Sequence, residues 1–155
     1  MPQDCGQNIG FIPGKGGIYI GMNFTGFITS IISGLSASFI AYHINSRAIF
    51  VWGDKAVTFG APVTEEALKT FICAAMGANI ILSHIVFGAV EAANDSIRHP
   101  GERGRLAALI GIISHGAFGA VTWAAARNQG SIFLGVAAAS LIHVGWNSAV
   151  MSMTK

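Results

Sequence analysis

The stretch "PVTEEALKTFICAAMGANIILSHIVFGAVEAAND", Pro62–Asp95, decides which fold the sequence predicts. It is apolar apart from a few polar residues, among them two adjacent glutamates near its start and Glu91 near its end. As one helix it would be about 45 Å long, at a rise of 1.5 Å per residue. It can also form two shorter antiparallel helices that break at Met76–Asn79, because Gly and Asn are common turn and cap residues. The choice depends on the environment of these helices.

The composition indicates that this environment is a lipid bilayer. The chain has 155 residues, of which 52% are hydrophobic and only 10% are charged, whereas about a quarter of the residues of a soluble domain are charged. Blocks of about 20 apolar residues match the hydrocarbon core of a bilayer, which is roughly 30 Å thick. The chain holds four such blocks: Gly17–Tyr42, Ala67–Ala93, Leu106–Ala126 and Ser131–Met153. The net charge of +2 is too small and too scattered to indicate a nucleic-acid partner.

Basic residues in the loops favour the two-helix interpretation. Cytoplasmic loops of membrane proteins collect Lys and Arg. The segment "SIRHPGERGR" carries three arginines, and the loop that we expect at residues 44–61 carries Arg47 and Lys55. Two short helices that enter and return place both loops, together with the C-terminus, on the cytoplasmic side. We therefore predict an all-α, polytopic transmembrane helix bundle of about five membrane helices, including a short helical hairpin at 62–94. Residues 1–16 are expected to form a flexible N-terminal tail, and 17–155 a single transmembrane helical domain in contact with lipid.

Ionisable residues inside the apolar blocks mark candidate functional positions, because each costs several kcal/mol in a membrane. The hairpin returns Glu91 to nearly the depth of Glu66, whereas one straight helix would hold them about 37 Å apart. His115 and His143 both lie about 15 Å from the cytoplasmic ends of their helices, so we expect them to meet. Asn147 lies one turn from His143 on the same face. The estimated depth of the glutamates is only about 6 Å, which requires tilt or a sunken helix start at "VTFGAPV".

A structural role for these residues is the alternative, since polar side chains also hydrogen-bond between membrane helices. Lys69 is most simply an ion-pair partner of Glu65 or Glu66. His84 is equally compatible with a core position and a site position. The coincidence of carboxylates, imidazoles and an amide at consistent depth favours a site.

The chemistry of this set suits activation of water. No Ser or Cys lies beside a base, whereas a glutamate can accept a proton from water while His and Asn donate to a developing oxyanion. The same residues could hold a zinc ion that lowers the pKa of its bound water. The spacing does not separate these two mechanisms, and no H-E-x-x-H motif is present.

Four motifs occur in the order found in a known family: "EEALK" (Glu65–Lys69), "FGAVE" (Phe87–Glu91), a histidine in "ISHGAFG" (His115) and "HVGWN" (His143–Asn147). They resemble the PrsW family of intramembrane proteases, whose signature is EExxK, FxxxE, a lone His in a membrane helix and HxxxN. That family is related to the Ras-converting CAAX-type proteases and the CPBP (Abi) proteins, which show EExxxR, FxxxH and HxxxN. The resemblance covers about residues 62–150 and does not extend over 1–61.

The resemblance implies an intramembrane endopeptidase that cleaves membrane-anchored protein substrates in a bacterial or archaeal cytoplasmic membrane. Either Glu65 or Glu66 would activate water, and Asn147 would stabilise the oxyanion. His115 and His143 would orient the water or bind a metal ion. Glu91, in the place of the second-motif His of the relatives, would complete a metal site with the two histidines. Zinc and a metal-free glutamate mechanism both remain open, as does the oligomeric state.

Two other functions fit the same residues. A transport or channel subunit could use Glu and His as a proton or cation relay. A non-catalytic membrane scaffold could use them only to hold its helices together.

Overall fold

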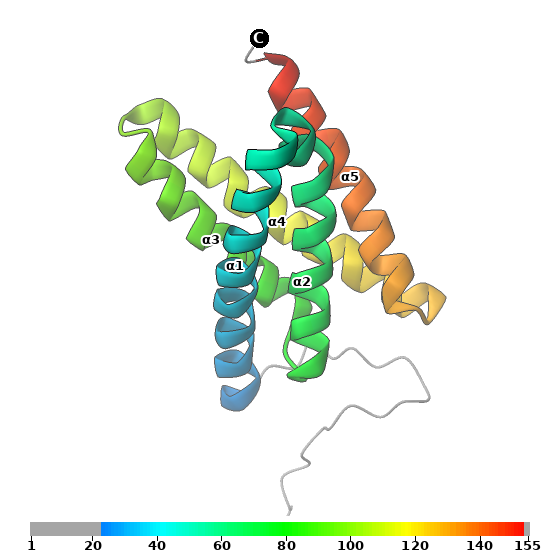
Figure 1. Cartoon of the computed structure of the whole chain (residues 1–155). Coiled ribbons are helices and arrows are strands. Elements are labelled where there is room, and N and C mark those ends of the chain that lie inside the picture. Colours follow the sequence, from blue (N-terminus) through cyan, green and yellow to red (C-terminus); the bar gives the residue numbers. More distant parts are fainter. Residues whose placement is uncertain (1–22, 154–155) are drawn as a thin grey trace, which may run out of the picture.

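A computed structural model, which describes residues 23–153, shows a bundle of helices (Figure 1), and no strand occurs in this part of the chain. The predicted all-α bundle is therefore confirmed. The expected tail at 1–16, and residues 17–22 of the first apolar block, lie outside the described residues. The elements are α1 (Phe24–Trp52), the π-helical turn η1 (Ala56–Gly60), α2 (Ala61–Ala75), α3 (Ile80–Arg98), α4 (Glu102–Gln129) and α5 (Ile132–Met153).

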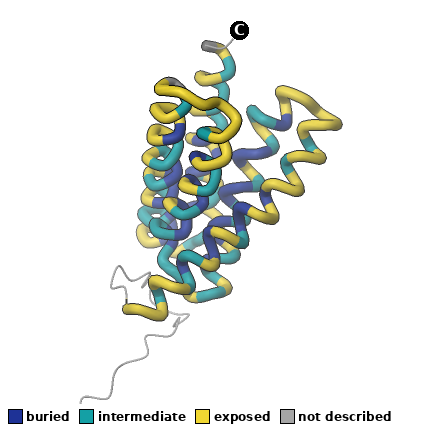
Figure 2. Tube along the Cα trace, turned by 90° about the vertical axis from the view of Figure 1, so that its left-hand side faces the viewer, coloured by how far each residue is buried: buried dark blue, intermediate teal, exposed yellow. Residues whose placement is uncertain are grey.

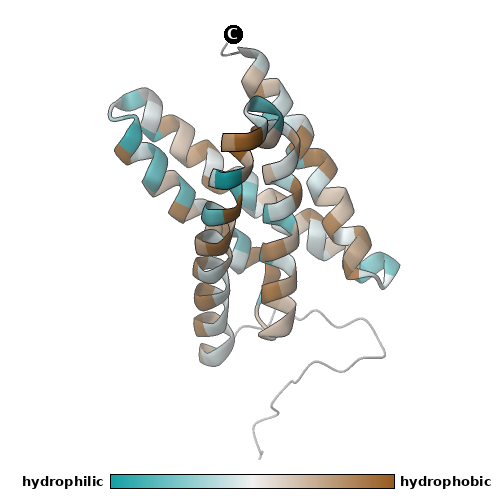
Figure 3. Ribbon diagram, viewed as in Figure 1, coloured by the Kyte–Doolittle hydropathy of each residue, from teal (hydrophilic) through white to brown (hydrophobic). Residues whose placement is uncertain are grey.

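Four of these helices, α1, α3, α4 and α5, are long and apolar enough to cross a membrane. Helix α2 has 15 residues and would span only about 22 Å, less than a hydrocarbon core. Large apolar side chains stay exposed on the outer faces of the long helices, among them Phe50, Ile113 and Leu141. Figure 3 shows hydrophilic residues gathered at the α3–α4 and α4–α5 connections. The chain is thus an integral membrane protein with one short helix, α2, that is half-buried among the longer ones.

The hairpin breaks where the sequence predicts. Helix α2 ends at Ala75, and Gly77 adopts a φ of 59°, a left-handed conformation that glycine tolerates best. The side chain of Asn79 then accepts a hydrogen bond of 3.0 Å from the backbone nitrogen of Leu82 and caps α3. Helices α2 and α3 therefore run in opposite directions from this turn.

The loop predicted at 44–61 is wrong over its first half, because α1 continues to Trp52. The polar residues there are compatible with a helix: the hydroxyl of Ser46 donates to the carbonyl of Tyr42 at 2.6 Å. The helix ends at Gly53, which has a φ of 54°. The turn η1 then leads directly into α2, whose first residues, Ala61 and Pro62, are buried. The start of α2 is thus packed inside the bundle rather than exposed at its end.

The helices form a ring in which α1 packs against α2 and α3, α4 against α3 and α5, and α5 against α2. Figure 1 shows the α1–α2 connection, the α3–α4 connection and the C-terminal end of α5 together at the top. We call this the basic end, since Arg47, Lys55, Arg98 and Arg105 lie there. The start of α1 and the α2–α3 and α4–α5 turns lie at the opposite end. Buried residues concentrate where the helices face one another (Figure 2).

Close packing of α1 on α3 depends on Gly34. A Cβ atom at this position would lie 2.7 Å from the carbonyl oxygen of Ser83 and 2.7 Å from the Cβ of Val86. Small residues allow membrane helices to approach this closely, and buried small residues line the same face of α1: Ser30, Ser33, Ala37, Ser38 and Ala41.

We predict that Gly34→Ala destabilises the bundle by about 1–3 kcal/mol, the usual cost of overpacking a dense interface. Unfolding in detergent, followed by circular dichroism, measures the effect. Gly145→Ala on α5 is the matched control, because no atom lies within 4 Å of the added Cβ. Equal unfolding midpoints for the two variants would contradict the role of Gly34.

Candidate functional site

The site is organised around the carboxylate of Glu66, which is fully buried on α2. Its Oε1 accepts hydrogen bonds from Lys69 Nζ at 2.6 Å and from His143 Nδ1 at 3.0 Å. Its Oε2 lies 3.1 Å from His84 Nε2. A buried carboxylate is costly unless it is paired and hydrogen-bonded, and here partners from three helices satisfy it. Glu66 is thus the ion-pair partner of Lys69, and His84 belongs to the cluster.

Lys69 connects Glu66 to the histidine of α4. Its Nζ lies 3.0 Å from His115 Nδ1, and His115 Nε2 lies 2.5 Å from Glu91 Oε2. Because a lysine ammonium only donates, Nδ1 of His115 accepts, and the ring hydrogen is on Nε2, which donates to Glu91. The two carboxylates Glu66 and Glu91 therefore share one site through Lys69 and His115 rather than by direct contact.

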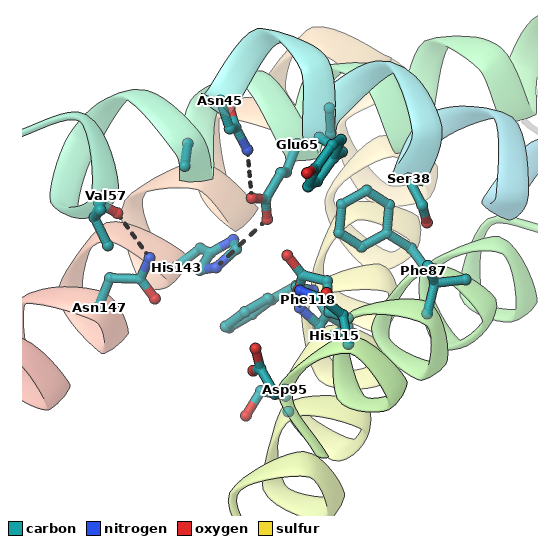
Figure 4. A pocket seen from close by; sticks show the side chains of 18 of the residues that line it. Ser38, Asn45, Val57, Glu65, Phe87, Asp95, His115, Phe118, His143 and Asn147 are labelled. Atoms are coloured by element: carbon teal, nitrogen blue, oxygen red, sulfur yellow. Dashed lines mark hydrogen bonds and ion pairs between the residues drawn. The ribbon is translucent and has the colours of Figure 1, made fainter. Parts of the chain in front are cut away.

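Glu65 occupies a different position from its neighbour, facing a cavity (Figure 4). Its Oε1 accepts a hydrogen bond of 2.9 Å from Asn45 Nδ2 on α1. Its Oε2 lies 4.0 Å from His143 Nε2. Since Nδ1 of His143 donates to Glu66, Nε2 of the neutral ring carries a free lone pair. A carboxylate and an imidazole lone pair thus face each other across a short gap.

The two histidines meet as the sequence predicts, with ring centroids 5.3 Å apart. Phe118 stacks on His143 with a centroid distance of 4.5 Å. Gly88 on α3 makes room for His115, because a Cβ there would lie 2.9 Å from the His115 side chain. Phe118 therefore packs against the ring of His143, and the backbone of α3 at Gly88 packs against the ring of His115.

Asn147 lies one turn from His143 and lines the same cavity. Its Nδ2 donates to the carbonyl of Val57 in η1 at 2.9 Å (Figure 4). A carboxamide nitrogen carries two hydrogens, so the second one is available to a ligand. The π-helical turn thereby fixes the orientation of this amide.

The cavity has a volume of about 940 Å³, near the upper end of the range for ligand pockets. Polar residues Asn94, Asp95 and Arg98 line it near the basic end, and the Glu65–His143 pair lies deeper. The other walls are largely apolar, with contributions from Leu35, Phe39, Tyr42, Ile49, Ile110, Trp146 and Val150. The cavity therefore suits an apolar chain whose polar backbone reaches the site.

A possible metal centre was predicted from His115, His143 and Glu91. The structure brings Glu65 to the two histidines, with one ligand atom of each residue within 4.8 Å of the others. Two His and one Glu are the donors of some catalytic zinc sites. A ligating nitrogen needs a free lone pair, however, and Lys69 occupies Nδ1 of His115 while Nε2 carries the hydrogen. In this arrangement the donor set does not fit a three-ligand zinc centre.

Asn45 and Val57 are site residues that the sequence did not identify, and both lie outside the stretch that resembles the protease family. The signal for Asn45 was helical spacing. Ser38, Ala41 and Asn45 share one face of a helix, and the first two are buried. Assigning residues 44–61 to a loop hid this relation. Val57 acts through its backbone carbonyl, which no side-chain pattern can reveal.

Comparisons with known proteins identify no relative of this chain. No family description, curated protein or solved structure matches it.

We predict that Lys69→Met destabilises the folded protein by about 3–5 kcal/mol, the cost of removing one partner of a buried ion pair. Lys55→Met is the matched control, because Lys55 is exposed near the basic end. Unfolding of both variants in detergent measures the difference. A Lys69→Met variant as stable as Lys55→Met would show that Glu66 does not need the ammonium.

Proposed function

We propose that this protein is a membrane-embedded endopeptidase that hydrolyses a peptide bond of membrane-anchored protein substrates, with Glu65 as the general base. One observation carries the proposal: Glu65 Oε2 and the lone pair of His143 Nε2 face each other at 4.0 Å in a large, mostly apolar cavity. A water molecule about 2.8 Å from each atom would hydrogen-bond to both. The apolar walls would exclude further water and strengthen the electrostatic interactions at the site.

The reaction follows from these positions. Glu65 accepts a proton from the water as the water oxygen attacks the carbonyl carbon of the scissile bond. The tetrahedral intermediate then collapses, and Glu65 returns the proton to the leaving nitrogen as the C–N bond breaks. The products are a carboxylic acid, which keeps the second hydrogen of the water, and an amine, and no further reactant is needed.

One donor is suited to stabilise the oxyanion of the intermediate. Asn147 has one amide hydrogen beyond the one that it donates to Val57. His115 has no such hydrogen, because its Nε2 hydrogen is already donated to Glu91 and its Nδ1 accepts from Lys69, so it acts as a positioning residue. Donors that are fixed before the reaction stabilise a developing charge most effectively, and Asn147 is fixed by its hydrogen bond to Val57.

Glu66 supports the reaction without touching the substrate. Both of its oxygens already have partners, and its side chain is fully buried. By accepting the hydrogen of His143 Nδ1 it directs the lone pair of Nε2 toward Glu65. Of the two glutamates of the EExxK-like motif, Glu65 is therefore the proposed base and Glu66 the positioning residue. The order of the four motifs, which resembles that of the PrsW family, further supports the proposal.

The relay and scaffold alternatives account for less of the geometry. A relay must pass protons on, whereas His84, which joins the cluster through Glu66, donates its Nδ1 hydrogen to the carbonyl of Ile80 at 2.8 Å. A backbone carbonyl offers no proton to pass on. A scaffold role explains why Glu66 is buried and paired. It does not explain why Glu65 and the lone pair of His143 face a cavity.

We predict that Glu65→Gln lowers cleavage of a co-expressed membrane-anchored reporter by at least about 10²-fold, the lower range for loss of a general base. Glu102→Gln is the control, because Glu102 is an exposed glutamate at the start of α4. Immunoblots of the reporter and gel filtration of each purified variant provide the readout. Cleavage that persists in a folded Glu65→Gln variant would exclude Glu65 as the base.

A second prediction concerns metal. Because His115 has no free lone pair while Lys69 donates to it, purified protein should hold less than one zinc per chain, and chelators should leave reporter cleavage unchanged. Elemental analysis of the purified protein tests this expectation. One zinc per chain that is lost in His143→Ala would instead establish a metal-dependent mechanism.

A further inference from the structure

Most of the cavity lies on one side of the site. Its walls come mainly from the half of each long helix that approaches the basic end and reach slightly past the middle of α1, α3 and α4: they include residues 35–49 of α1, 87–98 of α3, 107–118 of α4 and 143–150 of α5. Several of these residues are exposed at that end, including Ser46, Asn94 and Arg98. The cavity is therefore open at the basic end, and the exposed side chains of Leu35 and Phe39 show that it is also open beside the middle of α1.

On the other side of the site the helices are closely packed. A Cβ on Gly119 would lie 2.8 Å from His84, and one on Gly135 would lie 2.6 Å from the carbonyl oxygen of Thr122. Gly34 packs as tightly against α3. These contacts cross the α1–α3, α3–α4 and α4–α5 interfaces, so these three interfaces are closely packed beyond the histidines.

The basic end is the cytoplasmic one by charge. Arg47, Lys55, Arg98 and Arg105 lie near it, whereas Arg127 lies near the opposite end. Lys and Arg close to the ends of membrane helices favour the cytoplasmic side. The cavity therefore opens toward the cytoplasm.

We propose, resting on the endopeptidase function above, that substrates enter from the cytoplasmic side and are cut just inside that boundary of the membrane. Glu91 lies seven residues before Arg98, and His143 lies ten residues before Met153, which places the site about 10–15 Å from the basic end at 1.5 Å per residue. An extended chain advances about 3.3 Å per residue. The cut is therefore about three to five residues inside the cytoplasmic end of the substrate's membrane segment.

This placement defines the substrate class. The occupant is the cytoplasmic end of a single apolar membrane segment, unwound so that its backbone reaches Glu65. The exposed apolar residues Phe39 and Tyr42 of α1 and Trp146 of α5, which line the cavity, would contact its side chains. A segment whose cleavable sequence lies at the outer end of the membrane would not reach the site.

Access can be tested without any substrate. In a Cys5→Ser background, where Cys73 is buried, single cysteines replace Ser46 near the mouth of the cavity, Ser114 deeper in it and Gln129 at the opposite end. Membrane-impermeant maleimide should label Ser46→Cys and Ser114→Cys in inside-out vesicles, and Gln129→Cys only in right-side-out vesicles. Labelling of Ser114→Cys from the same side as Gln129→Cys would overturn the inference.

Cut-site position provides the second test. Two single-span reporters carry the same cleavable sequence, one at the cytoplasmic end of the span and one at the outer end, and mass spectrometry locates the cut. We expect cleavage of the first reporter, about three to five residues inside the boundary, and less than a tenth as much of the second. Cleavage of the second reporter alone would overturn the inference while leaving hydrolysis intact. One-sided labelling without cleavage of any reporter would instead contradict the endopeptidase function.

Discussion

The buried carboxylate of Glu66 is the constraint on which the rest of the structure depends. An isolated charge in a membrane interior is costly, so Glu66 requires polar partners, and they come from α2, α3 and α5. Lys69 extends the network to His115 on α4. One anion thus connects four of the five helices. Replacing either Glu66 or Lys69 leaves the other as a buried charge without its partner. The positions of these side chains relative to one another are therefore closely constrained.

The adjacent glutamates divide their roles because of helix geometry. Successive residues of an α-helix point about 100° apart, at 3.6 residues per turn, so Glu65 and Glu66 point in different directions and contact opposite sides of the His143 ring. Glu66 faces the network, whereas Glu65 faces the cavity and is held by Asn45. The network in turn holds His143 with its lone pair toward Glu65. The structural role of Glu66 and the proposed chemical role of Glu65 are thereby coupled through the imidazole of His143.

The sequence predicted the elements that local patterns control. Apolar block length predicted the spanning helices, and Gly77 and Asn79 predicted the hairpin turn. Matched depth predicted that His115 and His143 meet. The sequence did not predict the continuation of α1 to Trp52 or the π-helical turn. Polar residues such as Asn45 and Ser46 are equally compatible with a loop and with a helix at the membrane boundary. The contacts of Asn45 and Val57 join residues 20 and 90 positions apart, and no local pattern encodes them.

The sequence by itself determined an all-α membrane bundle, the hairpin and the small set of ionisable residues near its centre, because hydrophobic burial and turn chemistry are local properties. Only the tertiary structure decided which glutamate is paired and which faces the cavity. It alone also decided which nitrogen of each histidine is engaged, and toward which end the cavity opens. These depend on the rotation and tilt of each helix against its neighbours, which are set by contacts such as Gly34 on Ser83 and Gly88 on His115 rather than by the period of any one helix.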